Sequence, residues 1–541
     1  MATTYSIICS IIIPVYDPPA DVLRATIDSV LAQSSPHWEL CIVDDASPSA
    51  EVWPILARYA EADGRIKAIR RDENGGISRA SNDALALATG EFVAFVDHDD
   101  LLIGEALAIV DREITEHGPV DYAYTDEAKI LPDGRIGSPF YKPDWSPERM
   151  RSQMYTAHLS VMRRTLVTEL GGFRPEFDGS QDYDLVLRVS ERTDRILHIA
   201  EPLYLWRAVE GSAAAEEDAK PWALEAGRRA VQEHCARVGI DAIVEMLPEA
   251  GCYRVHRRLQ GDPLVSIVIP TRGSSARVQG ESRVHLLHAV SSVLERSTYA
   301  NIEFVVVADQ ETPAPVIREL ERLGSDRVRI VWFDGPFNFS AKVNAGVATS
   351  AGDVLLLLND DVEVVTPDWI ETMVALAQEP DCGLVGAKLL FADGSLQHGG
   401  HVYPGGNMAH TYHRYPRDEP GMANLLRIER ECSGVTAACA AVRRDVWEQV
   451  GGFCEQLPGN YNDVDFSLKI RDRGLRVVWT PHAVLYHFES LTRVPEIKSW
   501  ESAVMKRRWD RMLFPDPYFN PNLDQGRTDW VISRPPEAWV S

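Results

Sequence analysis

The sequence predicts an α/β protein with two Rossmann-like domains in tandem, each built around a mostly parallel sheet. Short apolar runs that indicate buried strands alternate with segments that carry apolar residues at helical spacing. Carboxylates directly follow several of these runs, and most of the motifs return in the same order roughly 260 residues later. Alternating strands and helices favour parallel pairing with right-handed crossovers, and the repetition predicts two copies of that unit.

In the first half, the strand "SIIIPVY" from Ser10 is followed by a helical pattern behind Pro18 and Pro19. The runs "ELCIVDDAS" from Glu39 and "FVAFVDHDD" from Phe92 are strands that end in carboxylates. In parallel sheets the ligand crevice lies beyond the carboxyl ends of the strands. We therefore expect one crevice to gather the acids of this edge, which are Asp44, Asp45, Asp97, Asp99 and Asp100.

The second half repeats these motifs with small insertions. The runs that match those three strands are "SIVIPTR" from Ser266, "EFVVVADQE" from Glu303 and "VLLLLNDD" from Val354. Two later pairs also match: "GGFRPEF" from Gly171 with "GGFCEQL" from Gly451, and "SQDYDLVLRV" from Ser180 with "YNDVDFSLKI" from Tyr461. The repeat predicts a first domain over 1–207, a helical and extended connector over 208–262, a second domain over 263–493, and a tail over 494–541 packed on a domain.

Composition narrows the class of protein. The chain of 541 residues has 80 acidic and 55 basic side chains, and its formal charge of −25 argues against wrapping a nucleic-acid backbone. Eight cysteines without a CxxC pair fit reduced thiols. The N-terminus lacks the features of a signal peptide, and no apolar run is long enough to span a bilayer. We expect a cytoplasmic protein, at most peripherally attached to the inner membrane.

An Asp-x-Asp at the end of a buried strand suits a hard divalent cation, because Mg²⁺ and Mn²⁺ prefer oxygen ligands. For an isolated motif, a solvated turn or a helix cap is the simpler interpretation. Here the motif Asp97-His98-Asp99 has a counterpart in Asn359-Asp360-Asp361 at the end of "VLLLL". The recurrence in a matching context favours a functional site.

These motifs together resemble the GT-A glycosyltransferases of family 2, specifically bacterial rhamnosyltransferase-like members that build cell-surface polysaccharide. The resemblance covers nearly the whole chain. Beyond the strand motifs, it is carried by "NGGISRASNDALALATGEF", "QDYDL", "QHGGHVY", "VTAACAAVRR", "NDVDFSLKI" and "YHFESLTR". It implies GT-A domains, a nucleotide-sugar donor, and Mn²⁺ or Mg²⁺ as the cofactor.

The resemblance also implies roles for individual acids. The nucleotide-sugar would be bound by Asp44, Asp45 and Asp97 in the first half, and by Asp309 and Asp360 in the second. Ala308 stands where the first half has Asp44. The metal would be held by Asp99 in the first half, and by Asp361 and His487 in the second.

The catalytic base of an inverting reaction would be Asp182 in "QDYD" and Asp463 in "NDVD". From the residues alone, capping of the helices that start there is the first-ranked interpretation of these two acids. Acceptor pockets would be lined by His158, Trp206 and Arg207 in the first half, and by His398 and Thr436 in the second.

Two histidine features qualify this assignment. Val209 stands where the family pattern Trp-Arg-x-His-x-Gly-Ser has histidine, which weakens the expected metal site of the first half. A zinc cluster of His398, His401, His410 and His413 is disfavoured, because no cysteine or acidic partner has matching spacing.

The first hypothesis is a bifunctional inverting glycosyltransferase that moves sugars, rhamnose from dTDP-rhamnose or a UDP-sugar, to a growing O-antigen- or capsule-type glycan or lipid-linked glycan. The alternative is one catalytic domain beside a non-catalytic glycan-binding or scaffolding domain, which Val209, Ala308 and Asn359 favour. A sugar nucleotidyltransferase would need a Gly-rich basic loop after the first strand, where this chain has "PVYDPPAD" and "PTRGSSAR".

Overall fold

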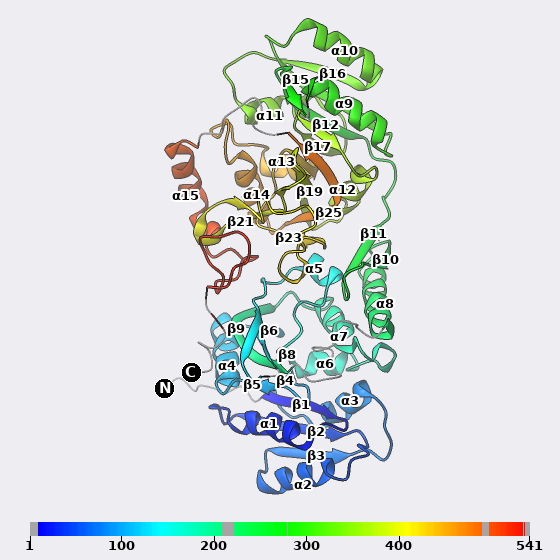
Figure 1. Cartoon of the computed structure of the whole chain (residues 1–541), viewed down its shortest axis with the longest axis vertical. Coiled ribbons are helices and arrows are strands. Elements are labelled where there is room, and N and C mark those ends of the chain that lie inside the picture. The colour runs from blue at the N-terminus through cyan, green and yellow to red at the C-terminus, as the bar shows by residue number, and fades with distance from the viewer. Residues whose placement is uncertain are drawn as a thin grey trace.

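The computed structural model describes residues 9–131, 133–207, 221–278, 280–488, 497–533 and 535. Its two large sheets lie one above the other along the long axis of the molecule (Figure 1). Each sheet is mixed, with a parallel half formed by the first strands of its repeat. The predicted fold class, two tandem α/β domains, is confirmed.

The first sheet has nine strands, and eight of them form one continuous path. In spatial order these are β3 (Ile66–Arg70), β2 (Trp38–Asp44), β1 (Cys9–Val15), β4 (Phe92–Phe95), β8 (Ser160–Arg163), β6 (Tyr122–Ile130), β9 (Ile196–Arg207) and β5 (Leu101–Leu102), with β7 (Ile136–Phe140) paired to β6.

The second sheet repeats this order strand for strand. Its path is β16 (Val328–Phe333), β15 (Ile302–Asp309), β12 (Val265–Thr271), β17 (Val354–Leu358), β24 (Cys439–Arg443), β19 (Cys382–Leu390), β25 (Arg476–His487) and β18 (Val362–Val364). In addition β20 (Leu396–His398) pairs with β19, and β23 (Arg430–Glu431) pairs with β25. The sequence repeat is therefore a repeat of topology.

Helices cover both faces of each sheet, because successive side chains of a central strand point to opposite faces. The helices of the first domain are α1 (Ala20–Leu31), α2 (Val52–Ala62), α3 (Ile77–Leu87), α4 (Ala106–His117), α5 (Pro147–Ser152), α6 (Arg164–Glu169) and α7 (Gln181–Ser190). Ile11 and Ile13 pack in one apolar cluster with residues of α1, α2 and α4, whereas Ile12 packs in another with residues of α3 and α7.

The second domain follows the same plan around "VLLLL", whose five residues in β17 are all buried. Its helices are α9 (His285–Arg296), α10 (Ala314–Gly324), α11 (Phe339–Thr349), α12 (Trp369–Ala377), α13 (Arg444–Val450) and α14 (Asn462–Asp472). Two small antiparallel ribbons are formed by β13 (Ser275–Val278) with β14 (Glu281–Val284), and by β21 (His401–Val402) with β22 (Ala409–His410).

A connector and a C-terminal segment join the two domains. The connector consists of α8 (Pro221–Arg237), β10 (Ala242–Met246) and β11 (Tyr253–Arg257), and α15 (Ser499–Leu513) lies on the second domain (Figure 1). After α15, Asn520 donates to Asp126 Oδ2 at 2.9 Å in the first domain, while Asp516 accepts from Tyr403 N in the second at 2.5 Å. This segment therefore contacts both domains.

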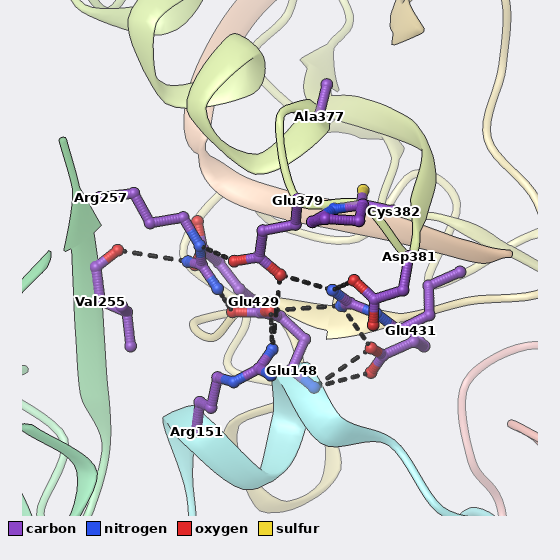
Figure 2. A network of polar contacts seen from close by, with 12 residues as sticks. Glu148, Arg151, Val255, Arg257, Ala377, Glu379, Asp381, Cys382, Glu429 and Glu431 are labelled. Carbon is purple, nitrogen blue, oxygen red and sulfur yellow. Dashed lines mark hydrogen bonds and ion pairs between the residues drawn. The ribbon is translucent and has the colours of Figure 1, made fainter. Parts of the chain in front are cut away.

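A buried charge network ties the connector to both domains, as Figure 2 shows. Glu148 of α5 is fully buried and pairs with Arg257 of β11 at 2.6 Å and with Arg476 of β25 at 3.4 Å. Glu379 lies between the two arginines, at 2.5 Å from each. Because ions buried together must be paired, these contacts fix the domains relative to each other.

Two further features bear on the sequence expectations. All eight cysteines are free thiols, and seven are buried. Among the described residues, the longest apolar helical stretches fall short of what a bilayer crossing needs.

Candidate active sites

A cavity of the second domain lies at the carboxyl ends of its central strands. It has a volume of about 460 Å³. Its walls include Thr271 at the end of β12, Asp309 at the end of β15, and the turn that follows β17. The predicted residues that line it are Asp309, Asp360, Asp361, Thr436, Asp463 and His487. The expected crevice is therefore where the topology of a parallel sheet places it.

A lysine organises the donor side of this cavity. Lys342 of α11 is nearly fully buried, and its ammonium donates to Thr271 O at 2.7 Å and to Asp309 Oδ1 at 2.8 Å. Thr271 Oγ1 in turn donates to Asp360 Oδ2 at 2.5 Å. Burial, and then the neighbouring Asp361 charge, raise the pKa of Asp360 to about 7. The site holds a positive charge among three carboxylates.

Asp361 and His487 form an arrangement that fits a divalent cation. His487 Nε2 lies 3.1 Å from Asp361 Oδ1, and His487 Nδ1 lies 2.7 Å from Gln397 Oε1. Gln397 Oε1 accepts the proton of Nδ1, so a cation at Nε2 would take the place of the proton that His487 otherwise shares with the Asp361 carboxylate. Burial opposes ionisation of Asp361, but the charge and hydrogen bond of His487 outweigh it and lower the pKa.

Asn359 supports the same conclusion. Its Oδ1 is buried and has no hydrogen-bond partner among the described residues, while its Nδ2 lies 3.0 Å from His487 Nε2. A carboxylate, an imidazole nitrogen and an unpaired amide oxygen are ligand types that Mn²⁺ accepts. The residues present therefore fit the metal that the sequence motif implied.

Asp463 lies in the first turn of α14, on the other side of the cavity. Tyr461 occupies the N-cap position, so Asp463 is inside the helix and is not its cap. Burial raises the pKa of Asp463, while His410 and a Thr436 hydroxyl bond act against this shift. A carboxylate with a raised pKa that faces a cavity is suited to accept a proton.

Three histidines gather beside Asp463. His398 is fully buried and is not among the residues that line the cavity, whereas His401 and His410 do line it. One ring nitrogen from each of the three lies within 4.8 Å of the others. The spacing argument against a histidine cluster is corrected here, because the β21–β22 ribbon folds His410 back onto His401.

The first domain has a much smaller cavity of about 70 Å³ at the equivalent edge. Asp97, His158 and Asp182 line it. Ser180 is the N-cap of α7, so Asp182 occupies the same place in its helix as Asp463 does. Burial raises the pKa of Asp182, and the charge of Asp97 contributes. The two domains thus repeat the pairing of a strand-end acid with a helix acid.

The acids after β4 are held by β9. Tyr204 Oη donates to Asp100 Oδ2 at 2.5 Å, and Arg207 N donates to Asp100 Oδ1 at 2.7 Å. Arg207 Nε also donates to the Asp99 carbonyl at 2.8 Å. One ligand atom each of Asp97, Asp100 and His158 lies within 4.8 Å of the others. Asp99, the predicted metal ligand, is outside this group.

The remaining predicted residues of the first domain make contacts within the domain and do not line its cavity. Asp44 accepts from Ser47 N at 2.9 Å, and Asp45 accepts from Gly75 N and Gly76 N, each at 2.9 Å. Neither acid lines the 70 Å³ cavity. Trp206 also lies outside it, 5.9 Å from the His158 ring and under the Lys129 ammonium. Val209 lies outside the described residues.

Sequence reasoning missed several residues of the sites. Lys342 was one, although comparing the repeats exposes it: with Asn82 aligned to Asn344, Lys342 stands opposite Ala80. Asp100 was not assigned a role, and no sequence signal separates it from Asp99. Thr271 could have been noticed as the polar residue that ends "SIVIPT".

Comparison with known proteins agrees with this geometry. The model "Glycosyl transferase family 2" matches residues 10–171, and "Glycosyltransferase like family 2" matches residues 263–511. The two matches include the central strands of both sheets. The chain belongs to glycosyltransferase family 2, and it carries the family's domain twice.

Similar proteins include longer chains. An uncharacterized protein, y4gI, of Sinorhizobium fredii is 44% identical over 97% of this chain and 58% of its own length. The O-antigen biosynthesis protein RfbC of Myxococcus xanthus is 38% identical over 98% of this chain and 41% of its own. This chain thus spans about half the length of these relatives.

A solved structure, S. aureus TarS 1-349 in complex with UDP-GlcNAc, is 23% identical over 42% of this chain and 66% of its own, with a TM-score of 0.35.

Proposed function

We propose that this chain transfers a sugar, with inversion, from a nucleoside-diphosphate donor to a hydroxyl of a growing polysaccharide, and that the second domain carries out the transfer. One observation carries the proposal: Asp361, His487 and Asp463 line a single cavity of about 460 Å³. That volume falls within the range of roughly 300–1,000 Å³ of small-molecule sites. The family and the O-antigen name of the Myxococcus relative support this class of reaction.

In this mechanism the acceptor oxygen attacks the anomeric carbon from the side of Asp463. As the new carbon–oxygen bond forms, the bond to the diphosphate breaks and the hydroxyl proton passes to Asp463. A single displacement inverts the anomeric centre. The raised pKa of Asp463 brings it nearer to the working pH, which favours general-base catalysis.

The donor side would be held by Asp361, His487 and Lys342. Asp361 and His487 would hold Mn²⁺ or Mg²⁺, which neutralises charge on a diphosphate leaving group. Lys342, fixed by Thr271 and Asp309, adds a second positive charge at the same edge. The donor would be dTDP-rhamnose or a UDP-sugar, and the acceptor a glycan or a lipid-linked glycan of O-antigen or capsule type.

The first domain has two candidate roles. The bifunctional hypothesis is supported by Asp97 and Asp182, which line one cavity as Asp361 and Asp463 do. The non-catalytic alternative is supported by the small volume of that cavity, about 70 Å³, and by the hydrogen bonds that occupy Asp44 and Asp45. We favour the second domain as the catalytic one and treat transfer by the first as the further candidate.

The test is transfer from a panel of nucleotide sugars with Mn²⁺ or Mg²⁺, comparing Asp463→Asn with Asp182→Asn. We expect Asp463→Asn to lower kcat/KM for transfer of one sugar by about 10²–10⁴-fold while the fold is retained. Loss of a second, different transfer step in Asp182→Asn would establish the bifunctional hypothesis. If Asp463→Asn leaves every transfer step unchanged, the proposed role of the second cavity is wrong.

We further propose that the chain works in the cytoplasm at the inner face of an anionic membrane, and that α15 makes the contact. Lys506, Arg507 and Arg511 of α15 are exposed in a chain of net charge −25, and Trp500 and Phe514 beside them are about half exposed. Basic and aromatic side chains on one surface helix favour anionic lipid. Co-sedimentation with phosphatidylglycerol vesicles, but not with phosphatidylcholine vesicles, is expected for the chain and reduced for Arg507→Glu with Arg511→Glu.

A further inference from the structure

Two buried histidines of the second domain, His398 and His401, and the partly buried His410 surround a common point. The β21–β22 ribbon pairs His401 directly opposite His410, and His398 ends β20 two glycines earlier. The ring centroids of the three pairs are 4.7 to 5.0 Å apart, and the rings of each pair are inclined by 79° to 84°. Rings that are mutually perpendicular do not stack, and here a nitrogen of each lies near those of the other two.

Hydrogen bonding accounts for part of the cluster only. Thr436 N donates to His398 Nε2 at 3.3 Å, so the His398 proton is on Nδ1, which donates to His410 Nδ1 at 2.8 Å. His401 Nδ1 is buried and has no partner among the described residues. Buried polar atoms of folded proteins are almost always satisfied. A purely structural histidine cluster leaves this atom unexplained.

A transition-metal ion would satisfy it. Burial lowers the pKa of all three rings, that of His401 to about 3, so each imidazole is neutral and has a lone pair at neutral pH. Zinc–nitrogen bonds of about 2.0–2.1 Å at tetrahedral angles place ligand nitrogens about 3.3 Å apart. The Nδ1 atoms of His398 and His410, 2.8 Å apart, are already close to that separation.

Binding requires one proton to move. The His398 proton shifts from Nδ1 to Nε2, and the long contact from Thr436 N is given up. Thr436 lines the cavity and is only partly buried, so its N–H can turn to water instead. No bond to carbon is made or broken in this step.

We propose that His398, His401 and His410 form a binding site for a divalent transition-metal ion, Zn²⁺ above all, with an open coordination position that faces the cavity. Three imidazoles and one open position are typical of catalytic zinc sites, and a ligand set of imidazoles without any oxygen ligand does not suit Mg²⁺. His401 and His410 line the cavity beside Asp463, so the open position points to the space that the acceptor would occupy. The site is separate from Asp361 and His487. A role in transfer rests on the proposed function, whereas binding of the ion does not.

The test is metal binding by the full chain, without any activity readout. After dialysis against Zn²⁺ in excess Mg²⁺ and then against Mg²⁺ alone, we expect about one tightly held Zn²⁺ per chain. His401→Asn should weaken this binding by more than about tenfold, because it removes a ligand. Asp361→Asn, which removes the proposed magnesium-type ligand, and His413→Asn, a histidine of the same loop outside the cluster, should leave it unchanged.

X-ray absorption of the zinc-loaded wild-type chain gives an answer that does not depend on the folding of a variant. We expect a shell of imidazole nitrogens at about 2.0–2.1 Å. The proposal is overturned if wild type holds no more Zn²⁺ than His401→Asn, if Asp361→Asn or His413→Asn also loses the ion, or if the absorption spectrum contains no imidazole shell.

Discussion

Replacing Glu148 by glutamine tests whether the buried charge network holds the two domains together. The substitution keeps the shape of the side chain and removes the charge that faces three arginines. Those arginines are Arg257 at 2.6 Å, Arg151 at 3.0 Å and Arg476 at 3.4 Å. Because Glu148 is fully buried, water cannot replace the lost interaction.

The size of the effect follows from the pKa of Glu148. Burial alone would raise it, but the charges of Arg257, then Arg151 and Arg476, lower it from 4.5 to about 2. At about 1.4 kcal/mol per pKa unit, this is about 3 kcal/mol of stability. Removing one partner of a buried ion pair typically costs about 3–5 kcal/mol, in agreement.

The same pKa fixes the pH dependence. A carboxyl whose pKa is depressed by folding contributes its full stabilisation above the pKa of the unfolded state, and loses it as the pH falls through the folded value. For Glu148 the contribution is complete above about pH 5 and declines as the pH falls toward 2. The difference between wild type and Glu148→Gln should therefore shrink in acid.

Urea unfolding followed by circular dichroism measures this difference, with the midpoint of each domain's transition compared separately. Glu319→Gln is the matched control, because Glu319 pairs with Arg322 at 2.7 Å on an exposed face of α10. We expect the control to keep the wild-type midpoint. Equal midpoints for wild type and Glu148→Gln at pH 7, or a difference that does not shrink below pH 4, would refute the reasoning.

Three further predictions concern the second domain. Asp463→Asn should lower kcat/KM for transfer by about 10²–10⁴-fold, the usual contribution of a general base, with donor binding by calorimetry unchanged. Lys342→Met leaves Asp309 without its charged partner and should weaken donor binding by roughly 10–100-fold in the same calorimetric assay, with an unchanged circular dichroism spectrum as the control. Gly386→Ala should destabilise the second domain by about 1–3 kcal/mol in urea unfolding, because the added Cβ would lie 2.4 Å from Val435 Cγ1 in a packed core.

Much of the fold could be predicted because it depends on local patterns. Runs such as "SIIIPVY" and "VLLLL" form central strands, and the repeated motifs form sheets of equal strand order. The antiparallel strands β8 and β24 were not predicted, since they enter the sheet from segments whose pattern does not reveal the direction of pairing. The partners of Glu148 could not be predicted either: Arg257 and Arg476 lie 109 and 328 residues away in the chain.

The sites were predictable where a motif ends a strand and not where loops meet. Asp361 lines the cavity because sheet topology gathers strand ends, whereas Asp463 reaches the same cavity from the first turn of α14, and the resemblance implies the roles of both. The sequence disfavours a histidine zinc cluster because no cysteine or acidic partner has matching spacing, and spacing along the chain does not reveal a ribbon that folds back. Its signal lies in the pairing of His401 with His410, which only the structure provides.

The two copies of the domain show how a shared plan can lead to different clefts. At the end of the second strand of each sheet, Asp45 is bonded by two glycine N–H groups and by Arg71, and it is almost fully buried. Asp309 at the equivalent place is held by Lys342 instead, and 24% of its side chain stays exposed. Lys342 of α11 lines the cavity together with Asp309, and it neutralises Asp309 without covering it.

This difference in how one acid is neutralised is consistent with the difference in cavity volume. A carboxylate whose oxygens accept hydrogen bonds from loop N–H groups has few acceptor positions left for a ligand. A carboxylate that a buried ammonium neutralises keeps one face exposed to the cavity, with a positive charge nearby. A donor diphosphate is bound more readily in the second case. If the first domain is catalytic, its Asp45 loop must open for the donor to enter, and Gly75 and Gly76 are where that opening would have to begin.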